Sequence, residues 1–199
     1  MLCGEGIEHS PAVQSMDARI TTFIAAHRTA GLNQFMKAMT WTGSWLAGLS
    51  LAAVVIALTL RHRLRVAAVL ALLAAWCGEQ LAVTLTKAVV ERPRPPEALR
   101  LVVTHGWSFP SGHTANTVVI FTATAALLTT FLHRRTTRVV TWVLCVLTTA
   151  LVGFSRVELG AHWTSDVAVT AVWTAFWLLI VSRILRTMTD HPAPPISRG

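Results

Sequence analysis

Four cationic side chains stand out because the sequence around them is strongly apolar. They are Lys87, Arg92, Arg94 and Arg156. A guanidinium group presents paired N–H donors that match the oxygens of a phosphate, and a lysine adds a compact positive charge. Such clustered cations favour the binding of an anion, and of a phosphate in particular. A single arginine at a helix end can instead anchor the chain to lipid headgroups, and this alternative stays open for Arg92 and Arg100.

Two histidines and an aspartate supply groups that can react with a bound phosphate. Phosphoryl transfer needs a nucleophile and a proton donor, and His113 and His162 can take these roles. Asp166 lies four residues after His162, one helical turn away, so its carboxylate can hold the imidazole in one tautomer. Taken alone, His162 and Asp166 could be half of a metal site or, more simply, an interfacial ion pair. Their combination with the cationic residues favours catalysis.

Ser111 and Gly112 lie where the third long apolar stretch begins. Backbone N–H groups at a helix N-terminus, together with the helix dipole, stabilise a bound anion. The sequence therefore predicts that Ser111 and Gly112 help to hold the same phosphate.

Five apolar stretches are long enough to be transmembrane helices, and together they make up nearly half of the chain. They are Trp41 to Leu60, Val66 to Thr86, Thr114 to Leu132, Val139 to Phe154 and Val167 to Ser182. At about 1.5 Å per residue, the last two are shorter than a bilayer core of about 30 Å, so they must extend into their charged flanks. This extension places Arg156 and Asp166 at the membrane boundary.

The order of the spans predicts that the polar clusters share one membrane face. Two crossings separate residues 110–113 from residues 155–166, and no crossing separates residues 87–96 from residues 110–113. The opposite face carries nine arginines in short loops and the tail, an excess that marks the cytoplasmic side. The site is therefore predicted to face the extracytoplasmic side of a plasma membrane.

The remaining residues are assigned to terminal segments and one surface helix. Between 16 and 39, apolar residues recur in steps of three and four with charged residues between them, which predicts an amphipathic helix lying in the membrane interface. Residues 1–15 form an N-terminal segment, the membrane-embedded domain that carries the polar clusters is expected to span 16–186, and the tail 187–199 is expected to be disordered and cytoplasmic. The predicted fold is an all-α membrane bundle with five transmembrane helices and one interfacial helix, six in total.

Glu79 lies near the middle of the second predicted span. An intramembrane carboxylate is a functional candidate because burying it is costly. The simpler interpretation, which we favour, is a protonated side chain that is hydrogen-bonded to Ser or Thr on a neighbouring helix.

Composition excludes several classes of protein. Hydrophobic residues make up 53% of the chain and charged residues only 13%, so the net charge of +8 reflects membrane topology and not nucleic-acid binding. The three cysteines, Cys3, Cys77 and Cys145, lack the spacing of a disulfide framework or a zinc site. No carboxylate cluster suits magnesium, so no metal or other cofactor is predicted. The expected partners are membrane lipids and a lipid substrate, and no signal indicates an oligomeric state.

The order of the polar residues resembles the three-part signature of the type 2 phosphatidic acid phosphatase superfamily. The matching parts are Lys87, six residues and Arg94-Pro95; Pro110-Ser111-Gly112-His113; and Ser155-Arg156, five residues, His162, three residues and Asp166. These eleven identities in fixed order span the last three-fifths of the chain. The signature also occurs in vanadate-binding haloperoxidases, which are larger and soluble, so the five apolar spans favour the membrane branch.

This resemblance implies a role for each matching residue. His162 would attack phosphorus to give a phosphohistidine, Asp166 would orient it, and His113 would protonate the leaving lipid oxygen and then activate water. No metal takes part in the mechanism implied. The residues implied to bind the phosphate and to offset its charge in the transition state are Lys87, Arg94, Ser111, Gly112 and Arg156.

We therefore predict a membrane hydrolase that removes phosphate from a lipid, resembling bacterial undecaprenyl-diphosphate phosphatases. Polyprenyl diphosphate is the first-choice substrate because an outward-facing site suits this carrier lipid of bacterial wall assembly. Phosphatidic acid and phosphatidylglycerol phosphate are alternatives, as is phosphoryl transfer to another lipid. From another class, a lipid or anion transporter with a cationic outer site would explain Glu79 and the arginines. It gives no reason for two histidines together with Asp166.

Overall fold

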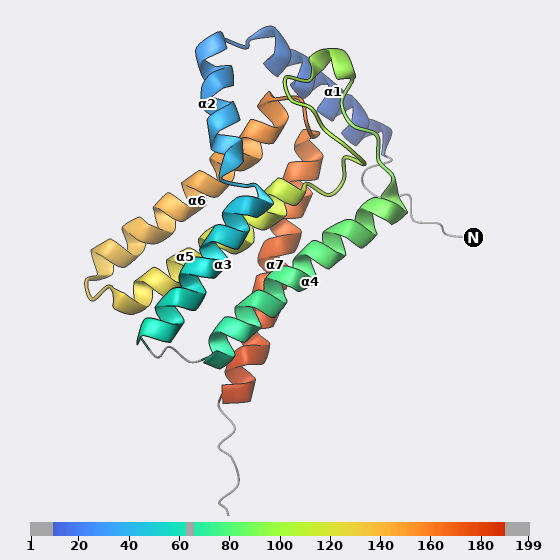
Figure 1. Cartoon of the computed structure of the whole chain (residues 1–199). Coiled ribbons are helices and arrows are strands. Elements are labelled where there is room, and N and C mark those ends of the chain that lie inside the picture. Colours follow the sequence, from blue (N-terminus) through green and yellow to red (C-terminus); the bar gives the residue numbers. More distant parts are fainter. Residues whose placement is uncertain (1–9, 63–65, 190–199) are drawn as a thin grey trace, which may run out of the picture.

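A computed structural model describes residues 10–62 and 66–189, apart from some side chains in residues 51–71 and 185–189. Every regular element in these ranges is a helix, and Figure 1 shows α1 and α2 at one end of a bundle of longer helices. The elements are α1 (Pro11–Ala26), α2 (Ala30–Trp41), α3 (Trp45–His62), α4 (Val66–Val90), the short 3₁₀ helix η2 (Glu97–Leu99), α5 (Gly112–Phe131), α6 (Arg135–Glu158) and α7 (Thr164–Thr189).

The helix α5 lies at the centre of the bundle. Half of its most apolar stretch (50%) is buried inside the protein, whereas only 11% of the corresponding stretch is buried in α6 and in α7. Large apolar side chains such as Leu147 on α6 and Leu179 on α7 are exposed. Extensive exposed apolar surface marks a site of membrane contact. In the described part of the chain, α5, α6 and α7 are each long and apolar enough to cross a membrane.

The structure places helices at all five predicted spans. α3 and α4 cover the first two, and many of their side chains lie outside the described residues, so the count of five transmembrane helices stays a prediction. The last two helices extend beyond the predicted limits at both ends, as their short apolar stretches required. Residues 1–9 and 190–199, which hold most of the two predicted terminal segments, lie outside the described residues.

The prediction of one continuous helix before the first span is wrong. The chain forms two helices there, α1 and α2, which raises the number of α-helices in the described residues from six to seven. Thr29 adopts an extended conformation, and its hydroxyl accepts a hydrogen bond from the backbone N–H of Leu32 at 3.3 Å, which begins a new helix. The apolar periodicity continues through both helices, so it does not reveal this break.

The predicted start of the first span at Trp41 is also wrong. α2 ends at Trp41 and α3 begins at Trp45. Asn116 of α5 fixes the intervening turn by donating to the backbone carbonyls of Gly43 at 3.1 Å and Ser44 at 2.7 Å. A side chain 72 or more residues further along the chain therefore sets this boundary.

The loops that carry the polar clusters lie at one end of the bundle. Figure 1 shows the chain between α4 and α5, the link between α6 and α7, and both N-terminal helices at this end. The short α5–α6 connection lies at the opposite end. The structure therefore confirms that residues far apart in the sequence gather on one side of the bundle.

Glu79 of α4 is fully buried in the bundle. Its carboxylate Oε1 accepts a hydrogen bond from the hydroxyl of Thr174 on α7 at 2.7 Å. The predicted contact with a threonine on a neighbouring helix is thus confirmed. Glu79 links α4 to α7 below the polar clusters.

Candidate active site

The end of α6 brings Arg156 and His162 together. After α6 ends, Gly160 adopts a left-handed conformation with φ of 68°, which a residue without a Cβ atom adopts at little cost. The backbone N–H groups of Ala161 and His162 then donate to the carbonyl of Arg156 at 2.9 and 3.1 Å. This tight return fixes both functional side chains at the same corner of the bundle.

His162 lies between Asp166 and Arg94. Its Nδ1 atom is 3.6 Å from Oδ2 of Asp166, a charge contact that is longer than a hydrogen bond. Its Nε2 atom is 3.2 Å from Nη1 of Arg94. An arginine only donates, so Nε2 is assigned as the acceptor and Nδ1 carries the proton. The Nε2 lone pair therefore lies on the side of the cationic groups.

His162 is held in its neutral form. Burial lowers its pKa to about 4, and the positive charges of Arg156 and Arg94 act in the same direction, while Asp166 opposes them. At neutral pH the imidazole therefore keeps the free lone pair that a nucleophile requires.

Arg94 is anchored mainly by backbone carbonyls. It donates to Gly106 at 2.8 Å, to Ala161 at 2.6 Å and to His105 at 3.0 Å, in addition to its contact with His162. Burial lowers the pKa of Arg94, yet a guanidinium group stays charged at neutral pH. The position and orientation of its guanidinium group are thus fixed before any substrate binds.

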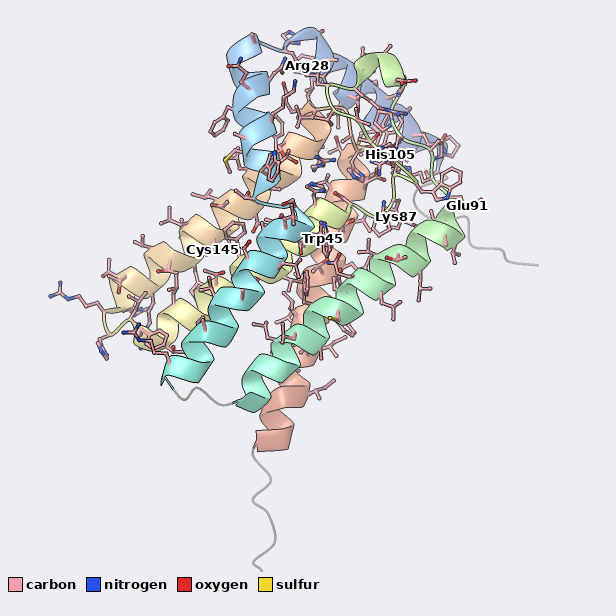
Figure 2. The ribbon with its side chains drawn as sticks, in the orientation of Figure 1. Arg28, Trp45, Lys87, Glu91, His105 and Cys145 are labelled. Atoms are coloured by element: carbon pink, nitrogen blue, oxygen red, sulfur yellow. The ribbon has the colours of Figure 1, made fainter. Side chains whose placement is uncertain are left out.

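Lys87 and Arg156 supply the other two predicted cations. Nζ of Lys87 donates to the carbonyl of Trp107 at 2.6 Å, and Figure 2 shows Lys87 and His105 at the same end of the bundle. Arg156 is buried and donates through Nη1 to the hydroxyl of Thr40 at 2.7 Å, while its Nε has no partner in the described part of the chain. Arg156 thus keeps several N–H groups for a ligand.

His113 begins the first turn of α5 and faces the same cluster. The charges of four neighbours act on its imidazole, so all of them lie within short electrostatic range of it. These neighbours are Arg156, His162, Arg94 and Lys87. The structure therefore brings both predicted histidines and the three predicted cations into one site.

Ser111 and Gly112 lie at the start of α5, as the sequence predicts: Ser111 is the N-cap residue and Gly112 is the first helical residue. The Ser111 hydroxyl accepts from the backbone N–H of Thr114 at 3.4 Å, and the Ser111 N–H donates to the hydroxyl of Thr170 at 3.0 Å. In this arrangement Ser111 caps the helix and ties α5 to α7. The phosphate contacts of Ser111 and Gly112 stay predictions.

Asp166 is held by three residues outside the catalytic and phosphate-binding set that the family resemblance implies. Arg92 donates to its Oδ1, while the Ser108 hydroxyl and the Trp163 N–H, the latter at 3.0 Å, donate to Oδ2. Arg92 is only 5% exposed, which excludes its alternative role as a headgroup anchor.

Asp17 of α1 completes the surroundings of Arg92. It is fully buried, and its Oδ2 is 2.8 Å from Nη2 of Arg92. The apolar periodicity of residues 16–39 places Asp17 among the charged residues of an interfacial helix and does not reveal this burial. The available signal was the excess of arginines at this end, because buried cations require buried carboxylates to offset them.

Comparison with known proteins places this site in a family. Residues 66–190 match the PAP2 superfamily. The chain belongs to the PAP2 superfamily. Phosphatidylglycerophosphatase B of Bacillus subtilis (strain 168) is 32% identical to this PAP2 protein over 164 residues, which cover 80% of this chain and 78% of the relative.

Two crystal structures resemble this PAP2 protein. The transmembrane PAP2 type phosphatidylglycerolphosphate phosphatase from Bacillus subtilis gives a TM-score of 0.83 at 26% identity, covering 92% of this chain and 91% of that chain. Aquifex aeolicus LpxE gives a TM-score of 0.65 at 25% identity, covering 89% and 98%. The chain is therefore a membrane-embedded lipid phosphate hydrolase of the PAP2 type, which sets aside the transporter alternative.

We expect His162 of the ligand-free protein to stay neutral until the pH falls to about 4, because burial and the nearby arginines disfavour the imidazolium. Histidine NMR in detergent across pH 2 to 8 measures the midpoint, and His162→Gln assigns the signal. Replacing Arg94 by methionine removes one opposing charge and should raise the midpoint. Arg135→Met, at the other end of the bundle, should leave it unchanged. A midpoint near the ordinary value of about 6.5 would contradict the buried arrangement.

Proposed function

We propose that this PAP2 protein removes phosphate from a lipid through a phosphohistidine at His162, in a site on the extracytoplasmic side of the plasma membrane. One observation carries the proposal: the imidazole lies between a carboxylate, 3.6 Å from Nδ1, and a guanidinium group, 3.2 Å from Nε2. The carboxylate side stabilises positive charge that develops on the ring, and the guanidinium side attracts the phosphate. These are the two requirements of a histidine nucleophile in phosphoryl transfer.

The proposed reaction has two steps. In the first, the Nε2 lone pair of His162 attacks phosphorus, the N–P bond forms and the bond to the lipid oxygen breaks. His113, protonated when the phosphate is bound, gives its proton to the leaving oxygen. In the second, a water molecule attacks phosphorus, the N–P bond breaks and His113 takes the proton of that water. The products are inorganic phosphate and the lipid with one phosphate fewer.

The cationic residues offset the negative charge of the transferring group. Arg156 has the most unoccupied N–H groups of the three, so we assign it the most direct contact with the phosphate oxygens. Arg94 and Lys87 are tied to loop carbonyls and supply fixed positive charge. Donors fixed in advance need little reorganisation as charge develops, which is the usual source of electrostatic catalysis.

The comparisons favour phosphatidylglycerophosphate as the substrate, because the Bacillus subtilis sequence relative and the Bacillus subtilis crystal structure are both named for that lipid. Polyprenyl diphosphate, predicted from the sequence on the basis of an outward-facing site, is the competing candidate. Both present a terminal phosphate on a lipid that stays in the membrane, so the same chemistry serves either one.

We expect wild-type protein in detergent with excess EDTA to release inorganic phosphate from phosphatidylglycerophosphate, and His162→Ala to lose this activity by roughly 10³-fold or more, because the nucleophile is gone. His133→Ala, which changes an exposed histidine at the far end of the bundle, should keep full activity. Faster release from polyprenyl diphosphate would reverse the substrate order. Persistent turnover by His162→Ala would contradict the nucleophile, and loss with EDTA would contradict metal independence.

A leaving-group experiment tests the role of His113. An alkyl oxygen needs a proton to depart, whereas a nitrophenolate does not, so His113→Asn should slow the first step on a lipid phosphate by about 10²- to 10⁴-fold and on p-nitrophenyl phosphate far less. Rapid-quench measurement of the released alcohol or nitrophenol monitors this step. An equal loss on both substrates would argue for a binding role of His113.

The orientation of the site can be read by cysteine labelling in intact cells. In a variant with Cys3, Cys77 and Cys145 replaced by serine, Val103→Cys introduces a thiol at a position that is 87% exposed beside the site. A membrane-impermeant maleimide should label it in intact cells, because the arginine-rich loops favour the opposite side as cytoplasmic. The matched variant Thr136→Cys, in the first turn of α6 at the far end of the bundle, should be labelled only after permeabilisation. The reverse pattern would place the site in the cytoplasm.

A further inference from the structure

We propose that Asp17 and Arg92 are positioning residues for phosphoryl transfer, which act through a buried chain of charges, Asp17–Arg92–Asp166, that ends at His162. The inference rests on the proposed role of His162 as the nucleophile. It assigns a catalytic contribution to α1, a helix outside the three-part signature.

The side chains of Asp17, Arg92 and Asp166 are almost completely shielded from solvent. The side chain of Arg92 is 6% exposed, that of Asp17 is 1% exposed and that of Asp166 is 0% exposed. Arg92 bonds Asp166 through Nη1 and Asp17 through Nη2, so one guanidinium group bridges two carboxylates. Ser165 reinforces the bridge, since its N–H donates to Oδ1 of Asp17 at 2.9 Å and its hydroxyl donates to Oδ2 at 2.5 Å.

Arg92 decides which oxygen of Asp166 faces the nucleophile. It occupies Oδ1, which leaves Oδ2 to face Nδ1 of His162 at 3.6 Å. Ser108 and the N–H of Trp163 hold Oδ2 from other directions. Without Arg92 the hydrogen bond that holds Oδ1 is lost, so the plane of the carboxylate is less firmly fixed about its Cβ–Cγ bond and the imidazole faces a less well-oriented partner.

Asp17 preserves the negative charge that His162 requires. When a histidine is phosphorylated at Nε2 and protonated at Nδ1, its imidazole ring carries a positive charge, so formation of the intermediate is favoured by a net negative charge behind Nδ1. Asp166 and Arg92 alone sum to zero, whereas Asp17 restores a net charge of −1 to the group. In a buried site this difference is poorly screened by water.

Neither residue is placed to bind the substrate directly. Arg92 is buried behind Asp166, with its guanidinium carbon 5.9 Å from the centre of the Trp163 ring. Asp17 carries the same charge as the phosphate. A positioning role therefore predicts a loss of kcat with KM retained.

The test uses the full-length protein in detergent and measures kcat and KM for phosphate release from phosphatidylglycerophosphate. We expect Asp17→Asn and Arg92→Met each to lower kcat by about 10- to 100-fold with KM within about 3-fold, as for a displaced catalytic group. Asp17→Glu, which keeps the charge, should recover part of the loss. The double variant should be no slower than Arg92→Met, because Asp17 acts through Arg92.

The matched control is Thr21→Val, one helical turn after Asp17 on α1. Thr21 is 1% exposed, and its hydroxyl has no partner in the described part of the chain. The valine keeps the shape of the side chain and introduces no charge, so kcat should stay unchanged. Thermal unfolding of every variant sets an assay temperature at which all are folded. If Asp17→Asn alone does not fold, Asp17→Asn/Arg92→Gln removes both charges and should still show the loss of kcat.

The outcomes separate this inference from the proposed function. Inactive His162→Ala together with wild-type kcat in both the Asp17 and Arg92 variants would overturn the positioning role alone. Active His162→Ala would overturn the phosphohistidine mechanism and this inference with it. A raised KM with unchanged kcat in Arg92→Met would assign Arg92 to substrate binding and overturn the inference. If Thr21→Val lowered kcat as much as Asp17→Asn does, the loss of kcat would come from altered packing of α1, and the positioning role of Asp17 would be overturned.

Discussion

The structure of the site depends on holding several positive charges close together in a region that is largely shielded from water. Buried charges are costly unless each is paired or hydrogen-bonded, and like charges at short range add to the cost. Arg92 is neutralised directly, by Asp17 and Asp166. Arg94 and Lys87 are stabilised by backbone carbonyls, which offset their desolvation without removing their charge. Arg94 and Lys87 therefore keep a positive potential where the phosphate binds. Around Arg92, beside the carboxylate that orients His162, the positive charge is cancelled.

This requirement explains the shape of the surrounding chain. The long segment between α4 and α5 turns its carbonyls toward Arg94 and Lys87. The turn after α6 adds the carbonyl of Ala161, which also accepts from Arg94. The N-terminal helices and the residues between them also form hydrogen bonds with this end of the bundle. Thr40 of α2 accepts from Arg156, and Arg28, between α1 and α2, donates to the carbonyls of Leu99 and Glu158. The two N-terminal helices are therefore part of the site, although the sequence places them far from the signature.

Local sequence features were sufficient to predict the residues that gather at the site. A helix must cross the bundle from end to end, so an even number of crossings returns the chain to the same side, and this fixes where Arg94, His113 and His162 meet. The short apolar stretches also required α6 and α7 to extend into polar flanks, and both do. These inferences need only helix length and the order of the elements.

Contacts between distant segments were beyond the reach of the same reasoning. Periodicity continues across the break before α2, where the cap formed by Thr29 starts a new helix. The cap that the Ser111 hydroxyl forms on α5, and the bond from its backbone N–H to Thr170 of α7, could not be predicted from the local sequence. Asp17 has the spacing of a solvated residue on an amphipathic helix, and only the partner that the fold brings to it, Arg92, makes it a buried one.

The distribution of occupied and unoccupied donors indicates how the site separates binding from catalysis. Four hydrogen bonds use most of the five N–H groups of Arg94, so this residue has little freedom to follow a moving phosphate. Arg156 makes one hydrogen bond and keeps its Nε unpartnered within the described residues, so it can gain contacts as the substrate arrives. The fixed charge of Arg94, next to Nε2 of His162, favours the geometry in which phosphorus is attacked. The less constrained guanidinium group of Arg156 can bind the phosphate as it arrives. Interactions that strengthen in the transition state raise the rate, whereas those made equally in both states only improve binding. Arg94 and Arg156 therefore serve the same phosphate at different stages of the reaction.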